Sequence, residues 1–176
     1  MKAVIISIRP KWCAKIASGE KSIEVRKTRP KLNPPFKVYI YCTLPRYPHE
    51  DFIETDYPQP QFYGGGKVIG EFTCNRVTNL FSNSRFWLDE DDILHTCLSA
   101  AEMRKYANGA NGLYGWHISN LKIYDKPREL SRFVKPYDAK ACPKPTVIEC
   151  GDCTKCYLKR APQSWCYAEE TDNDQT

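Results

Sequence analysis

Three charged residues near the start of the chain have the types and spacing that ligand binding or catalysis would need. They are Lys21, Glu24 and Arg26. Residues 22–26 alternate polar and apolar side chains, which predicts a strand over about residues 22–27 with Glu24 and Arg26 on the same face. Two cations can bind a phosphate or a base carbonyl, and the carboxylate can accept a hydrogen bond from an exocyclic amine. The structural alternative is an internal ion-pair cluster that fixes the register of the strand.

A short helix precedes this strand and positions its first residues. The pattern of residues 11–18, with Trp12 on the apolar side, predicts an amphipathic helix, and Gly19 is suited to end it. Trp12 could stack on a base beside the charged residues, and so could Trp116. Either tryptophan could instead belong to the core. His117 follows Trp116, so only one of these two side chains can face the core.

The charged residues also belong to a recognisable pattern. Gly19, Lys21, Glu24 and Arg26 fit G-x-K-x-x-E-x-R. This pattern resembles the signature of the ASCH domain, a branch of the PUA-like superfamily, and residues 7–12, 68–72 and 114–118 also resemble bacterial and phage-type ASCH proteins. The resemblance implies an α+β fold, a PUA-like mixed β-barrel of five or six strands flanked by helices, over residues 1–135. Residues 136–176 would form a Cys-rich C-terminal extension with an acidic tail.

The resemblance implies a binding function. We expect a basic cleft that binds RNA, another single-stranded nucleic acid, or a modified nucleobase or nucleoside. Residues 1–46 contain 11 Lys and Arg against 2 Glu, a net charge of +9 that suits a surface tracking phosphates. Simple solvation of the surface would give the same charge. The residues expected to bind are Trp12, Lys21, Glu24, Arg26, Lys27, Arg29 and Trp116.

An enzymatic alternative comes from the same resemblance. One bacterial ASCH branch hydrolyses acetylated cytidine-type nucleosides with a lysine, a threonine and a glutamate. Lys21 and Glu71 match the first and third of these, whereas Glu24 stands where the threonine would be and removes the hydroxyl nucleophile. A carboxylate could still act as a base toward water, so Lys21, Glu24 and Glu71 form the candidate catalytic set. Glu71 is expected to lie mid-strand, buried and paired with Lys21 and Arg26. A binding module is the favoured interpretation, and the question of catalysis stays open.

The C-terminal cysteines suggest a third function. The chain has nine cysteines, an odd number, and we expect no export signal, which favours reduced thiols or a metal site over disulfides. Four of the following five could hold a zinc ion, with an iron–sulfur cluster or unliganded thiols as alternatives: Cys142, Cys150, Cys153, Cys156 and Cys166. A zinc site would make a metal-stabilised protein-interaction module. The remaining cysteines are expected in the core: Cys13, Cys42, Cys74 and Cys97.

Length and composition set the remaining expectations. A chain of 176 residues with 41% hydrophobic and 27% charged residues can bury a sizeable core. No segment has the pattern of a signal peptide or a membrane span, so we expect a cytoplasmic protein without a membrane partner. Ser99 and Glu102 predict a capping box at the start of a second helix.

Overall fold

The computed structural model of the chain describes residues 3–44, 65–82, 85–86, 90–136 and 156–171. Its strands are β1 (Ala3–Ile8), β2 (Ile23–Arg26), β3 (Phe36–Cys42), β4 (Lys67–Ser82), β5 (Arg85–Phe86), β6 (Gly112–Arg128), β7 (Phe133–Val134) and β8 (Trp165–Glu170). Its helices are α1 (Pro10–Ala17), α2 (Glu90–Thr96), α3 (Ala100–Ala107) and the 3-10 helix η1 (Leu130–Arg132). None of the helices in these ranges is long and apolar enough to cross a membrane.

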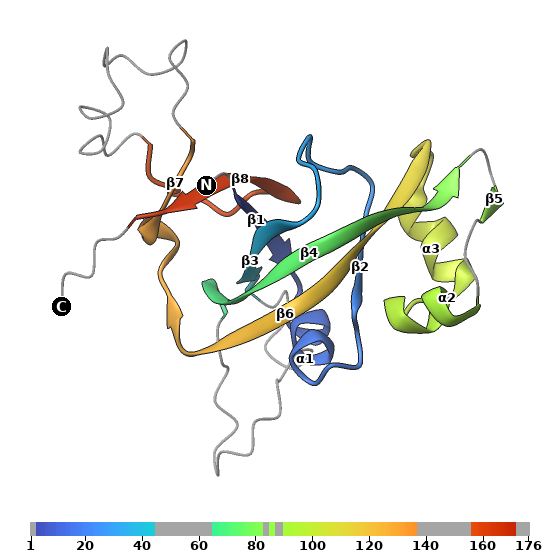
Figure 1. Ribbon diagram of the computed structural model, residues 1–176, viewed down its shortest axis with the longest axis horizontal. Coiled ribbons are helices and arrows are strands. Elements are labelled where there is room, and N and C mark those ends of the chain that lie inside the picture. The colour runs from blue at the N-terminus through green and yellow to red at the C-terminus, as the bar shows by residue number, and fades with distance from the viewer. Residues whose placement is uncertain (1–2, 45–64, 83–84, 87–89, 137–155, 172–176) are drawn as a thin grey trace.

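The strands form one mixed sheet, in the order β2-β6-β4-β3-β1-β8-β7, with β5 beside β4 (Figure 1). β1 and β3 pair in parallel, and the other pairings are antiparallel. The predicted α+β class is confirmed. The strand count exceeds the expected five or six, because two strands have only two residues each and β8 comes from the segment expected to be an extension. Within the described residues the sheet runs open from β2 to β7, so a closed barrel is not seen there.

β1 lies in the middle of the core and packs on both faces. Val4, Ile6 and Ile8 join a cluster with α1, β3 and β4, whereas Ala3 and Ile5 join a second cluster with residues of β3, β6, β7 and β8. A strand buried on both sides needs apolar residues at successive positions, which explains why every residue of β1 except Ser7 is apolar.

The helices α2 and α3 cover the end of the sheet that carries β2. Val25, Leu80, Met103, Ala107 and Leu113 form a third core cluster there, between the strands and α3. α3 begins with the predicted capping box. In this box the Glu102 backbone amide donates to the Ser99 hydroxyl at 3.2 Å, and the Ser99 backbone amide donates to Glu102 Oε2 at 2.8 Å.

The C-terminal strand closes over β1. β8 pairs with β1 from Ala3↔Ala168 to Ile6↔Trp165, and β7 pairs with β8 in turn. Residues 165–170 of the expected extension therefore lie in the same sheet as residues 3–8. The division of the chain into domains at residue 135 stays a prediction.

Candidate functional site

β2 positions the charged residues, and α1 sets where the strand begins. α1 ends at Ala17, and Gly19 adopts a φ of +80°, which favours glycine because its backbone lies in the left-handed region. β2 then pairs with β6, with Glu24 opposite Trp116 and Arg26 opposite Tyr114. The predicted alternation is confirmed, because Glu24 and Arg26 are ion-paired on one face and Val25 packs toward α3 on the other.

Lys21, Glu24 and Arg26, here called the buried triad, form one ion-pair network. Arg26 Nη2 lies 2.9 Å from Glu24 Oε1, and Lys21 Nζ lies 3.4 Å from Glu24 Oε2. The residues are only 2%, 5% and 7% exposed, respectively. Two cations and one carboxylate leave a net charge of +1 in this buried place, which is costly unless backbone or ligand oxygens surround the cations.

Backbone carbonyls supply part of that compensation for Lys21. Its ammonium donates to the carbonyl of Ile23 at 2.9 Å and to the carbonyl of Thr96 at 2.6 Å. With Glu24 as the third partner, the three protons of the ammonium each have an acceptor. Thr96 ends α2, and Ser22 N also donates to the carbonyl of His95 at 3.2 Å. The C-terminal end of α2 therefore covers Lys21.

Arg26 connects β2, at one end of the strand order, to β1 and to the segment before β8. Its Nη2 donates to the carbonyl of Ser7 at 2.7 Å, and its Nη1 donates to Ser164 Oγ at 3.5 Å. Two buried donors on the paired strands β2 and β6 have no acceptor among the described residues: Arg26 Nε and Trp116 Nε1. An unmet donor in the interior costs free energy, and a ligand oxygen or a water would satisfy it.

Glu71 lies apart from the buried triad, and the expectation that it pairs with Lys21 and Arg26 is wrong. Its carboxylate accepts from Tyr124 at 2.7 Å and lies 3.2 Å from Lys37 Nζ. The reason is strand alternation: Phe72, the next residue of β4, faces the α1 core, so Glu71 points to the other face. Burial raises the pKa of Glu71, but the hydrogen bonds from Tyr124 and Lys37 outweigh it and lower the pKa overall. The structure thus does not bring the candidate catalytic set together.

The exposed cations directly after β2 lie against aromatic rings. Lys27 Nζ is 5.3 Å from the centroid of the Tyr106 ring, and Arg29 Cζ is 5.8 Å from that of Tyr114. Trp12 is half-buried, with Lys11 Nζ 4.7 Å and Lys21 Nζ 5.2 Å from its ring. Proteins that bind single-stranded nucleic acids commonly combine basic side chains with aromatic rings in this way.

Trp116 and His117 divide between the two faces of β6 as predicted. Trp116 is fully buried, and its ring packs edge-on against Phe36 at 5.9 Å and tilted against Trp165 at 5.8 Å. Its ring is therefore part of the core and offers no open stacking face. His117 contacts Thr78 Oγ1 at 3.0 Å and Arg76 Nη2 at 3.3 Å.

Sequence reasoning missed Tyr106, which links the exposed cations to the buried triad. Tyr106 lies in the last turn of α3, is 38% exposed, and contacts both Lys27 and Arg26. Burial raises the pKa of its hydroxyl, and the Arg26 guanidinium acts in the opposite direction. The run Arg104-Lys105-Tyr106 was the available signal, since it places an aromatic ring beside two cations.

The cysteines separate into core residues and residues that the structure leaves open. Cys13, Cys42 and Cys74 are buried, whereas Cys97 is half-buried and donates from its thiol to the carbonyl of Glu20 at 3.4 Å. Cys142, Cys150 and Cys153 lie outside the described residues. Across the described ranges, no group of three or more His, Cys, Asp or Glu residues could hold a metal ion. The zinc site, with Cys156 and Cys166 as possible ligands, stays a prediction.

Comparison with solved structures identifies the architecture. A crystal structure of ASCH from Zymomonas mobilis superposes with a TM-score of 0.53 at 18% sequence identity, covering 94% of this chain and 86% of that chain. The chain has the ASCH fold. A crystal structure of a serine-to-alanine variant of the same Zymomonas mobilis protein gives a TM-score of 0.50 at 16% identity, covering 94% and 87% of the two chains. The sequence matches no protein-family model and no curated protein.

The ASCH fold gives the buried triad its place in the molecule. The residues that fit the signature pattern lie where β2, the end of α2 and the segment before β8 meet. Lys21 and Arg26 join these elements by hydrogen bonds, and the exposed cations Lys27 and Arg29 follow directly after them in the sequence.

Proposed function

We propose that this chain binds single-stranded RNA along the surface where β2 ends. The observation that supports the proposal is the pairing of exposed cations with tyrosine rings, Lys27 with Tyr106 and Arg29 with Tyr114. Cations attract phosphates, while aromatic rings stack on bases of any sequence. RNA-binding domains use the same combination of stacking rings and basic residues to hold unpaired strands.

The buried triad supports this function indirectly. Arg26 is the last residue of β2, and its side chain donates to the carbonyl of Ser7 on β1 and to Ser164 Oγ. These hydrogen bonds fix the direction in which the chain leaves the strand. Lys27 and Arg29 come directly after Arg26 in the sequence, so the buried triad fixes where their backbone lies. Substitution of Lys21 or Arg26 would remove an ion-pair partner from the buried Glu24 and so lower the stability of the fold. Substitutions of the exposed Lys27 and Arg29 are therefore the better tests of binding.

A modified base is the second part of the proposal. Arg26 Nε is a buried donor without an acceptor among the described residues, and Tyr106 lies beside Arg26 at the surface. A base stacked on Tyr106 would bring its carbonyl oxygens toward Arg26. Keto and acyl oxygens are the acceptors that such donors prefer.

A fluorescence-polarisation titration tests the RNA proposal. A labelled single strand of about 12 nucleotides is titrated at several salt concentrations between about 50 and 200 mM. For a single strand the slope of log K against log salt is roughly −0.7 per phosphate contact, so Lys27→Ala/Arg29→Ala should reduce its magnitude by about 1.4.

The matched control removes two exposed lysines of β6, which lie away from the proposed binding surface. Lys122→Ala/Lys126→Ala changes the net charge by the same amount, away from the tyrosine rings, and should leave most of the slope intact. Failure of the unaltered protein to bind at the lowest salt would overturn the proposal. Equal losses in the two double variants would also overturn it, because they would show a general effect of charge.

A further inference from the structure

The basic loop, residues 27–31, rests against the C-terminal strand. Trp165 Nε1 donates to Thr28 Oγ1 at 2.9 Å, and the backbone amide of Lys31 donates to the Tyr167 hydroxyl at 2.8 Å. In Figure 1 the connection from β2 to β3 rises beside β8. Two hydrogen bonds thus hold the loop at both ends of its exposed stretch.

The side chains that hold the loop are themselves fixed. Trp165 and Tyr167 are two residues apart on β8, so they project to the same face, and their ring centroids are 5.6 Å apart. Trp165 also packs against the fully buried Trp116 at 5.8 Å. These contacts leave the two aromatic side chains little freedom, so the loop is anchored to a rigid support.

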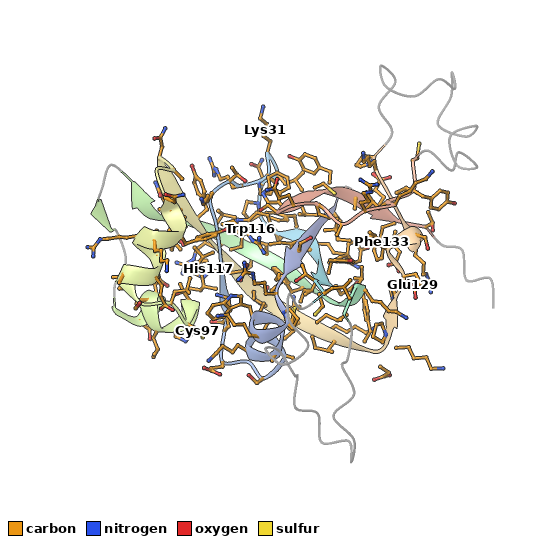
Figure 2. All side chains as sticks on the ribbon, turned by 180° about the vertical axis from the view of Figure 1, so that it is seen from behind. Lys31, Cys97, Trp116, His117, Glu129 and Phe133 are labelled. Atoms are coloured by element: carbon orange, nitrogen blue, oxygen red, sulfur yellow. The ribbon has the colours of Figure 1, made fainter. Side chains whose placement is uncertain are left out.

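The anchored loop presents its cations to solvent. Arg29 and Lys31 are exposed, and Figure 2 shows Lys31 at the outer tip of the loop, pointing away from the sheet. Ser164 holds Arg26 at the beginning of the same segment. Residues 164–167, at the start of β8 and directly before it, therefore contact the chain before the loop, within it and at its end.

We propose that Trp165 and Tyr167 are positioning residues for nucleic-acid binding, and that Lys31 joins Lys27 and Arg29 in contacting the phosphates of one strand. This inference rests on the proposed function. A loop already held in its bound shape loses less conformational freedom on binding, so the anchors increase affinity without touching the ligand. The C-terminal strand would then be part of the binding site, although its sequence is far from the signature.

The test removes the hydrogen bond of each anchor and keeps an aromatic side chain at the position. Tyr167→Phe deletes only the hydroxyl that accepts from Lys31, and Trp165→Phe deletes the indole N–H that donates to Thr28. Each variant should weaken binding of the single-stranded RNA by about 2- to 12-fold, the range that one hydrogen bond supports. Tyr157→Phe, on the isolated bridge to Val134, is the matched control and should leave the affinity unchanged.

Two further measurements separate positioning from a general structural effect. Amide hydrogen exchange read by NMR should be faster at Lys31 in Tyr167→Phe, with the amides of β1 unchanged. Thr28→Val and Trp165→Phe remove the same hydrogen bond, so the double variant should bind like either single variant. Additive losses in this pair would overturn the anchoring role of Trp165.

The outcomes also separate this inference from the proposed function. If the unaltered protein binds RNA and Lys27→Ala/Arg29→Ala weakens it, but Tyr167→Phe binds normally despite faster exchange at Lys31, only the positioning role is overturned. If the unaltered protein does not bind RNA at low salt, the proposed function and the role of the anchors both fail.

Discussion

Glu24→Gln tests whether the signature residues hold the fold together. Glu24 is the only carboxylate within ion-pair distance of Lys21 and Arg26 among the described residues, at 3.4 and 2.9 Å. The glutamine keeps the size of the side chain and one acceptor oxygen. It removes the negative charge, which leaves two cations facing each other in a place where the three residues are at most 7% exposed.

The expected loss of stability follows from the burial of the network. Removing one partner of a buried ion pair typically costs about 3–5 kcal/mol, because the remaining charge cannot reach water. For a chain of this size each kcal/mol lowers the melting temperature by about 2–4 °C, so the variant should melt roughly 6–20 °C below the unaltered protein. Native domains are stable by only about 5–15 kcal/mol, so this loss would be a large share of the total.

Urea unfolding followed by tryptophan fluorescence, together with thermal melts by circular dichroism, measures this loss. Glu20→Gln is the matched control, since it makes the same change in the exposed pair of Glu20 with Lys15. Its unfolding midpoint should stay within the error of the measurement. If Glu24→Gln unfolds at the same urea concentration as Glu20→Gln, the triad does not brace the fold and our reasoning is refuted.

Three further predictions concern pH dependence and the limits of the fold. Burial, and then Arg76, lower the pKa of His117 below 6.5, so Arg76→Gln should raise it in an NMR titration, and an unchanged value would contradict the contact. The lowered pKa of Glu71 means that its contribution to stability is present above pH 4.5 and is lost as the pH falls through its folded value; Glu71→Gln should therefore flatten the acid limb of stability against pH, and an unaltered limb would count against this. A fragment of residues 1–135 lacks β8 and should give the NMR spectrum of an unfolded or aggregated chain, whereas a dispersed spectrum would support a domain boundary there.

Local patterns in the sequence predicted the local structure well. The alternation in β2, the glycine after α1 and the capping box of α3 depend on residues close together in the chain, and all three are present. The opposite directions of Trp116 and His117 follow from the same period of two. These features need no knowledge of distant contacts.

The distant contacts of the site could not be predicted in this way. The face that Glu71 adopts depends on which side of β4 packs on α1, and the cover over Lys21 depends on where α2 lies. Pairing of β8 with β1 depends on hydrogen bonds between segments at opposite ends of the described chain. Alternating residues allow either face and many partners, and only the packed core selects among them.

The pairing of β1 with β8 also has a consequence in time. Ser7 Oγ donates to the carbonyl of Pro162, 155 positions later, beside the ladder that joins the two strands. At a synthesis rate of about 5–20 residues per second, roughly 8 to 30 s pass on the ribosome between the two segments. During that interval one edge of β1, in which every residue except Ser7 is apolar, lacks the β8 strand that pairs with it in the folded protein. Such an edge readily pairs with another molecule, so we expect the nascent chain to be prone to aggregation until β8 emerges.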